Sequence, residues 1–304
     1  MKNKSITALV SAFARAYHFE NDETCVFSDP IAKTLLGKKD YSNIASNMVN
    51  GIEFFYPNAQ LDEEQALRWI VNNYLLPSPI GRSKFTEDLL KNAVTLGTSQ
   101  YLILGAGYDS FAYRQPNYAK EIEIYEVDKP CIMSDKTNRL KCNNINIPTN
   151  VHHIALDLTS STWLSTLTDQ YNYDTTQISF CSLLGLTYYL TKEEFNTLVK
   201  SLSRVLPKGS ALIFDYPDED TFTKLAGIRT KKQQMLASKS GESFKASYDY
   251  KTMEAMLSEN DMLIYHHLTP QEITNQIFAD YNDANPDHTI HAFDNVNYCM
   301  AVKK

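Results

Sequence analysis

A Gly-x-Gly turn that directly follows an apolar run is the feature that most constrains the fold of this chain. Residues 101–104 are apolar, and Gly105, Ala106 and Gly107 come next. Glycine adopts backbone angles that other residues avoid and lets a ligand approach the main chain closely. A second apolar run ends at Asp128, at about the 20-residue distance where nucleotide-binding folds place the acid that holds a ribose. The pattern predicts an adenosine-containing cofactor at a strand-to-helix turn.

Strand-like and helical patterns alternate from this point onward. Strand-like runs cover 101–105, 122–127, 151–156, 178–184, 210–216, 262–268 and 297–303. Helical patterns over 135–141, 161–170 and 192–205 lie between them. Near-continuous apolar strands separated by helices are typical of a sheet that is covered on both faces. We therefore predict an α/β fold with a doubly wound, mostly parallel seven-stranded sheet.

The residues before the first strand show helical spacing only. Helices are expected over 5–17, 31–36, 62–76 and 85–95, with the prolines at 77 and 79 closing the third of them. We predict an N-terminal helical cap over residues 1–84 and a cofactor-binding core over 85–304. The polar helical segment 217–248 interrupts the alternation. It is expected to be an insertion over the carboxyl edge of the sheet, where ligands bind in such folds.

Composition and charge exclude several classes of partner. The net charge of −7 argues against a nucleic-acid binder, because phosphate contacts need a basic face. The basic run 229–232 is expected to be a solvated helix face. No window approaches the roughly 20 apolar residues that span a bilayer. The five scattered cysteines fit a reducing compartment. We expect a cytoplasmic protein with a small-molecule substrate and no membrane partner; the oligomeric state stays open.

The residues after the glycine turn discriminate between cofactors. The dinucleotide fingerprint requires a third small residue, Gly or Ala, where this chain has Ser110. Asp109 would also set a negative charge beside a bound pyrophosphate. Both features weigh against a nicotinamide dinucleotide. They fit S-adenosylmethionine better, because that cofactor contains no phosphate.

Two acidic residues at strand ends are candidates for holding the nucleoside. Asp128 is predicted to bind the ribose diol, since one carboxylate accepts two hydrogen bonds from vicinal hydroxyls. Asp157 could accept a bond from the adenine amino group while the backbone N–H of Leu158 donates to a ring nitrogen. The alternative for each acid is a cap on the turn or helix that follows it, and for Asp157 the two interpretations are equally weighted.

The histidines do not form a predicted metal site. Neighbouring residues on a strand point to opposite faces, so neither 152–153 nor 266–267 can chelate one ion as a pair. The spacing of His288 and His291 suits a helix, but no third ligand accompanies them. No nucleophile motif is present, and no catalytic residue is identified. Tyr188 and Tyr189 are candidates for lining an acceptor pocket, with core packing as the equal alternative.

Several short motifs in a fixed order resemble the leucine carboxyl methyltransferase family, which also includes bacterial polyketide-type O-methyltransferases. This family belongs to the S-adenosylmethionine-dependent superfamily of Rossmann-like fold. The resemblance runs from the first helix to about residue 216, with a looser match beyond. The matching pieces are residues 14–16, 29–32, 81–85, 104–110, 112–114, 126–130, 157–158 and 185–190.

The resemblance implies roles for individual residues. Arg82 would pair with the methionyl carboxylate of S-adenosylmethionine, a contact that suits the guanidinium fork. Gly105 and Gly107 would line the methionyl part, with Ala106 between them. Asp128 would hold the ribose, and Asp157 with Leu158 the adenine. Arg15 matches an arginine of the first helix that is expected to reach the active site.

One departure from the family pattern concerns the acceptor. Carboxyl methyltransferases carry an acid just before the glycine at the end of the fourth strand, where this chain has Leu184. The change favours small molecules over a protein tail as substrates. We expect O-methylation of a carboxylate or an acidic hydroxyl, because no general base is evident and a carboxylate is already ionised at neutral pH. Two alternatives stay open: a nicotinamide-dependent oxidoreductase, and a non-catalytic S-adenosylmethionine-binding protein.

Overall fold

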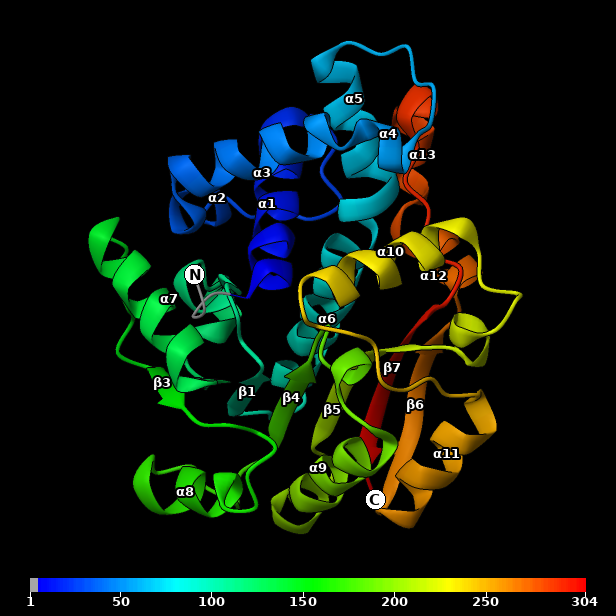
Figure 1. The fold of residues 1–304 in the computed structure, drawn as a ribbon. Helices are drawn as coiled ribbons and strands as arrows, with labels where there is room; N and C mark the ends of the chain where they lie inside the picture. The colour runs from blue at the N-terminus through cyan, green and yellow to red at the C-terminus, as the bar shows by residue number, and fades with distance from the viewer. Residues whose placement is uncertain (1–4) are drawn as a thin grey trace.

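A seven-stranded sheet forms the centre of the computed structural model, which describes residues 5–304 (Figure 1). The strand order is β3-β2-β1-β4-β5-β7-β6. The first five strands pair in parallel, and β7 runs antiparallel between β5 and β6. The strands are β1 (Gln100–Leu104), β2 (Glu123–Asp128), β3 (Val151–Ala155), β4 (Ser179–Leu183), β5 (Ala211–Pro217), β6 (Met262–Leu268) and β7 (Val296–Lys303). The predicted α/β fold with a mostly parallel seven-stranded sheet is confirmed.

Helices cover both faces of the sheet. Neighbouring residues of each strand point to opposite sides, so both faces carry apolar side chains that need a cover. Tyr101 and Ile103 of β1 join one apolar core, whereas Leu102 and Leu104 join the other. The first core includes residues of α6 (Pro77–Thr95), α7 (Pro130–Cys142) and α12 (Pro270–Ile277). The second includes residues of α8 (Trp163–Gln170), α9 (Lys192–Val205) and α11 (Tyr250–Glu259). The sheet is therefore doubly wound, as predicted.

The segment before β1 is helical throughout. It contains α1 (Ile6–Asn21), α2 (Ala32–Leu36), α3 (Lys38–Asn50), α4 (Ile52–Phe55), α5 (Glu63–Ile70) and a π-helical turn, η1 (Val71–Leu75). Helix α3 was not predicted, and it has no fully buried residue. The expected stop at residue 77 is wrong: Pro77 is the first residue of α6, a position where the missing N–H costs nothing. Helix α6 runs without a break through the predicted boundary at 84/85. The division of the chain into a cap over residues 1–84 and a core over residues 85–304 stays a prediction.

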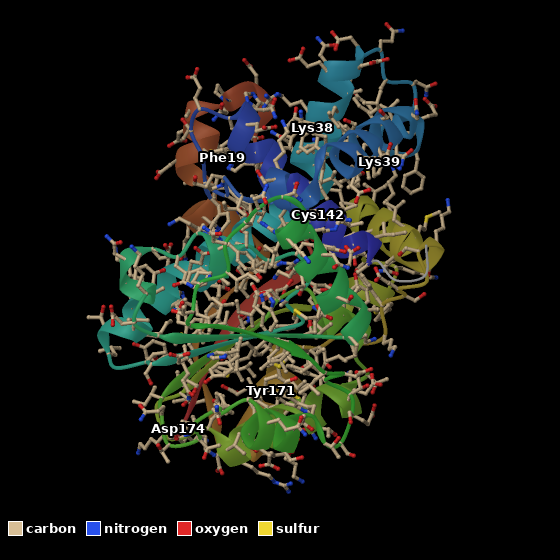
Figure 2. The ribbon with its side chains drawn as sticks, turned by 90° about the vertical axis from the view of Figure 1, so that its left-hand side faces the viewer. Phe19, Lys38, Lys39, Cys142, Tyr171 and Asp174 are labelled. Carbon is tan, nitrogen blue, oxygen red and sulfur yellow. The ribbon has the colours of Figure 1, made fainter. Side chains whose placement is uncertain are left out.

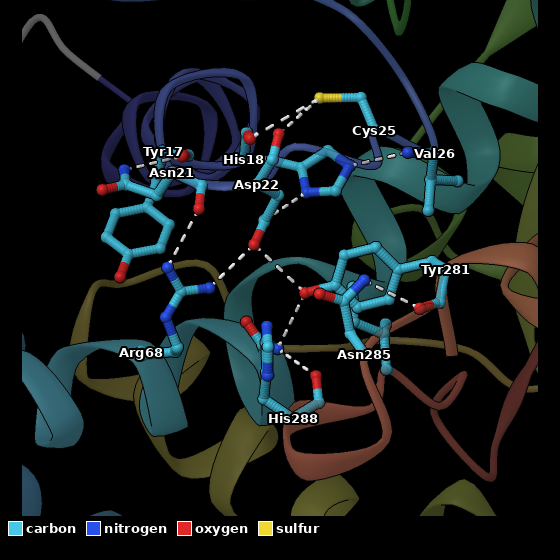
Figure 3. A network of polar contacts seen from close by, with 12 residues as sticks. Tyr17, His18, Asn21, Asp22, Cys25, Val26, Arg68, Tyr281, Asn285 and His288 are labelled. Carbon is cyan, nitrogen blue, oxygen red and sulfur yellow. Dashed lines mark hydrogen bonds and ion pairs between the residues drawn. The ribbon is translucent and has the colours of Figure 1, made fainter. Parts of the chain in front are cut away.

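A buried polar network around Asp22 fastens this helical segment to the C-terminal helices (Figure 3). One carboxylate oxygen of Asp22 lies 2.7 Å from Nδ1 of His18, and the other accepts from Arg68 of α5 at 2.7 Å. The hydroxyl of Tyr281, in α13 (Ala279–Ala284), donates to Asp22 at 3.2 Å. Asn72 then donates to the carbonyl of His288 in the short helix η6 (Pro286–His288). Burial alone would raise the pKa of Asp22, but its hydrogen bonds to His18 and Arg68 lower it overall.

The cap lies over the end of the sheet where the parallel strands finish. In Figure 2, Lys38 and Lys39 of the cap lie toward one end of the molecule, and Tyr171 and Asp174, which precede β4, lie toward the other. The predicted insertion contains a short helix, η5 (Glu219–Phe222), and α10 (Ile228–Lys239), which crosses the same end of the sheet as the cap (Figure 1). Within residues 5–304, no helix combines the length and apolar character that a membrane span requires.

Candidate functional site

A cavity of about 830 Å³ lies between the carboxyl edge of the sheet and the helices above it. The ends of β1, β2 and β4 form its floor, α1 and α6 form walls, and α10 with the segment after it forms the roof. This volume is in the upper part of the range of about 300–1,000 Å³ that small-molecule sites occupy. The cavity therefore has room for a nucleoside cofactor and a second small molecule.

The glycine turn lies on the cavity floor, as its sequence predicts. Gly105 and Gly107 have φ values of +73° and +47°, in the left-handed region that favours glycine. A Cβ atom on Gly107 would lie 3.2 Å from Cβ of Ala8 in α1, and one on Gly105 would lie 3.1 Å from the side chain of Leu186. Gly105, Ala106 and Gly107 all line the cavity. The absence of side chains keeps this part of the floor open to a ligand.

Asp128 also lines the cavity, at the end of β2. Its two carboxylate oxygens accept backbone N–H bonds from Gly107 and Lys129, each at 2.7 Å. Burial raises the pKa of this carboxyl, against the lowering effect of those two bonds. A carboxylate oxygen has two lone-pair sites, so each oxygen keeps one for a further donor. Asp128 thus ties the glycine turn to β2 and can accept from a ribose diol.

Arg82 reaches the cavity from α6, beside the end of β4. Its Nη1 lies 3.2 Å from Oδ2 of Asp215 in β5, and among residues 5–304 it donates a hydrogen bond to no other group. The remaining guanidinium N–H groups can therefore serve a ligand. Burial would lower the pKa of Arg82, but the charge of Asp215 raises it overall. The guanidinium is the kind of group that binds a carboxylate by two parallel hydrogen bonds.

The predicted adenine contacts lie outside the cavity wall. Asp157 and Leu158 follow β3 at the same edge of the sheet but do not line the cavity. The carboxylate of Asp157 accepts from the backbone N–H of Thr159 at 3.0 Å and from its hydroxyl at 2.8 Å, which lowers the pKa of Asp157. This is the turn-capping alternative considered from sequence. The role of this pair in holding adenine stays a prediction.

Arg15 lines the cavity, but its guanidinium is engaged by the protein itself. It donates to Asp29 at 2.8 Å and to the carbonyl of Tyr108 at 2.7 Å. The hydroxyl of Ser110 donates to the same Asp29 oxygen at 2.6 Å and accepts from Arg114. This explains why a serine stands where a dinucleotide fingerprint has Gly or Ala. Arg15 therefore fixes the glycine turn from above.

The roof is attached to the first helix by Glu242. Its carboxylate accepts from the hydroxyl of Ser5 at 3.0 Å and from that of Thr7 at 2.6 Å. Gln233 of α10 also lines the cavity, and its side-chain oxygen is buried with no partner among the described residues. Tyr188 and Tyr189 both line the cavity and pack against Phe244, with ring centroids 5.1 and 5.8 Å apart.

Sequence reasoning missed Asp215, although the strand contains a signal for it. Asp215 is the single charged residue in an otherwise apolar run, 211–217, and its side chain is fully buried. A buried acid is almost always paired, so its presence in such a strand predicts a cationic or hydrogen-bonding partner. Gln233 and Glu242 lie in a segment whose sequence carries no recognisable motif.

Comparisons with known proteins show the family of this chain. The model of the family described as leucine carboxyl methyltransferase matches residues 8–203. The Bacillus subtilis (strain 168) protein named "Putative S-adenosyl-L-methionine-dependent methyltransferase YktD" is 38% identical over 309 residues, which cover 100% of this chain and 99% of that protein. A Mycobacterium tuberculosis relative with the same designation, Rv3399, is 28% identical over 225 residues, or 70% of this chain and 60% of the relative.

Solved structures share the fold at low sequence identity. A crystal structure of a "putative methyltransferase" from Thermobifida fusca YX has a TM-score of 0.56 at 13% identity, covering 100% of this chain and 96% of that chain. A DUF574 family protein from Streptomyces avermitilis MA-4680 has a TM-score of 0.60 at 12% identity, covering 97% of both chains. These likenesses concern the fold alone. The family match over most of the chain and the full-length relative show that this protein belongs to the leucine carboxyl methyltransferase family.

Proposed function

We propose that this protein transfers a methyl group from S-adenosylmethionine to an oxygen atom of a small molecule, preferably a carboxylate. As a member of its family it is an S-adenosylmethionine-dependent methyltransferase. The acceptor is the proposed part. The observation that carries it is the lining of the cavity, which combines groups suited to the cofactor with apolar side chains and, among the described residues, contains no histidine.

The residues on the floor fit the cofactor. Asp128 offers a hydrogen-bond acceptor for a ribose, and Arg82 offers a cation for the methionyl carboxylate. The glycine turn between them carries no side chain that would fill the space. When bound, S-adenosylmethionine supplies an electrophilic methyl group on a sulfonium. The chain's own part is to align an acceptor with that methyl and to exclude water.

Apolar and aromatic side chains also line the cavity. They come from four separate elements and the segment after α10: Val10, Met48, Tyr74, Leu75, Leu236 and Phe244. Such a surface suits an acceptor with an apolar or aromatic body. Gln233 can orient one polar group of that acceptor, because its buried side-chain oxygen lacks a partner among residues 5–304.

The two tyrosines of the lining offer no base, which favours an acceptor that is already ionised. Burial raises the pKa of Tyr189 to about 12, and burial also raises the pKa of Tyr188 well above the usual value for a tyrosine. Neither tyrosine can therefore serve as a base at neutral pH. Attack by a carboxylate oxygen on the methyl carbon forms a C–O bond and breaks the C–S bond, whose electron pair stays on sulfur. No proton moves in that step, so no base is required.

Product chemistry tests the proposal directly. Purified protein is incubated with methyl-labelled S-adenosylmethionine and a panel of matched aromatic and aliphatic carboxylic acids, phenols, amines and thiols. Mass spectrometry then detects the label, and mild alkali distinguishes methyl esters, which are hydrolysed, from ethers, which survive. Alkali-labile products from acids support the carboxylate as acceptor. Labelling confined to amines, thiols or peptides would refute O-methylation of a small molecule.

A further inference from the structure

The most informative group outside the cavity wall is the carboxylate of Asp215. Its side chain is fully buried, and it does not line the cavity. It nevertheless collects donors from two elements that do line the cavity. Oδ1 accepts from the backbone N–H of Gly185 at 2.6 Å, while Oδ2 accepts from Arg82 at 3.2 Å and from the hydroxyl of Tyr188 at 3.1 Å.

A buried acid in the middle of an apolar strand is costly. Removing a carboxylate from water costs several kcal/mol, and an ion pair often only balances that cost. An apolar residue at this position of β5 would avoid that cost, but it would leave the Gly185 N–H, the Arg82 guanidinium and the Tyr188 hydroxyl without this acceptor. The carboxylate therefore holds three donors in one place, and the guanidinium of Arg82 is one of them.

The side chain of Arg82 is packed closely against the turn that contains Gly185. Gly185 has a φ of +66°, and a Cβ atom at this position would lie 2.7 Å from Cζ of Arg82. On the other side, a Cβ atom on Gly81 would lie 2.5 Å from the hydroxyl oxygen of Tyr298 in β7. Helix α6 thus approaches the turn after β4 at Gly185 and approaches strand β7 at Gly81. The Asp215 carboxylate joins helix α6 and the turn after β4 at the point where Arg82 enters the cavity.

Asp215 lies close to Leu184, the position where carboxyl methyltransferases carry an acid. The register that pairs Leu183 with Phe214 places residue 215 beside residue 184 on the neighbouring strand. The negative charge is therefore found one strand away and behind Arg82. It cannot touch a ligand from there, so its influence must pass through the side chain it holds.

We propose that Asp215 is a positioning residue for the methyl donor, because its carboxylate fixes Arg82 and the Gly185 turn so that the guanidinium faces the donor's carboxylate. This inference rests on the proposed use of Arg82 in binding S-adenosylmethionine. It predicts that Asp215 affects ligands that carry the methionyl group and leaves ligands without it unaffected.

Calorimetry with two ligands tests this. S-adenosylhomocysteine carries the amino-acid part of the donor, whereas 5′-methylthioadenosine has the same adenosine but no carboxylate. Asp215→Asn should weaken S-adenosylhomocysteine binding roughly 10- to 100-fold, the range of a hydrogen bond between charged groups. Binding of 5′-methylthioadenosine should change less than about threefold. Glu126→Gln is the matched control, because it removes another fully buried carboxylate, paired with Lys136 at 2.9 Å, that does not line the cavity. It should leave the ratio of the two affinities unchanged.

The possible failures are distinguishable. If the unmodified protein binds neither ligand, the cofactor site itself is wrong. If it binds both and Asp215→Asn weakens both equally, or neither, the positioning role is refuted while the proposed function stands. Should Asp215→Asn fail to fold, Arg82→Met is compared with the double variant Arg82→Met/Asp215→Asn. The double variant removes both charges of the pair, so neither is left buried without its partner. Equal S-adenosylhomocysteine affinity in these two variants supports the inference, and a further loss in the double variant overturns it.

Discussion

The substitution Gly185→Ala should have two effects, a loss of stability from backbone strain and a loss of affinity for the methyl donor from displacement of Arg82. Gly185 has a φ of +66°, which costs a residue with a Cβ atom about 1–2 kcal/mol. In addition, the new methyl would lie 2.7 Å from both Cζ and Nη2 of Arg82, well inside contact distance. The guanidinium is the end of a flexible side chain, so it will move rather than the backbone. Gly185→Ala should therefore fold, melt about 2–8 °C lower, and bind S-adenosylhomocysteine at least tenfold more weakly.

Gly209→Ala is the control for this variant. Gly209 has a φ of +89°, yet a Cβ atom there would have no neighbour within 4 Å. It should show a similar loss of melting temperature without any loss of affinity. Calorimetry and thermal denaturation on the two variants give both quantities. Equal affinities for S-adenosylhomocysteine in the two alanine variants would refute the reasoning, because the contact with Arg82 would then have no consequence for binding.

Three further results are expected. Asp128→Ala should weaken S-adenosylhomocysteine and 5′-methylthioadenosine alike, by about 1–3 kcal/mol, since both carry the ribose; calorimetry that finds unchanged affinities would show that the ribose lies elsewhere. Asp22→Ala should lower the free energy of unfolding by about 3 kcal/mol, measured in urea, because Arg68 and Tyr281 lose a buried partner. The pKa of Asp22 is lowered in the folded state, so its contribution is complete above about pH 4 and is lost as the pH falls through the folded-state value. Asp22→Asn should therefore flatten the decline of stability below about pH 4, and an unchanged decline would contradict this account.

Much of the architecture was predictable, because strand periodicity and turn residues act locally. The run ending at Leu104 and the glycine turn after it specify both a buried strand and the open floor of the cavity. The stop expected at Pro77 was wrong for a reason that is also local. Proline ends one helix and begins another equally well, and only the packing of η1 against α6 decides between them.

The candidate site was predictable only where its residues line the cavity and belong to a motif. Asp128 and Arg82 belong to motifs and line the cavity. Asp215 acts through Arg82, which is 133 positions away in the chain, and that pairing depends on strand order. The apolar part of the lining was harder still to predict, because α1, α3, η1, α10 and the segment after α10 each contribute one or two of its side chains.

The insertion of β7 between β5 and β6 has a consequence for synthesis of the chain. Residues 296–303 supply the strand that pairs with both neighbours, so the edge of β5 stays open until they leave the ribosome. Tyr298 of this strand also packs against Gly81, one residue before Arg82. A nascent chain halted before residue 296 would expose an unpaired edge, which invites aggregation. Ribosome-bound intermediates should therefore retain a nucleoside only after residues 296–303 have emerged and paired.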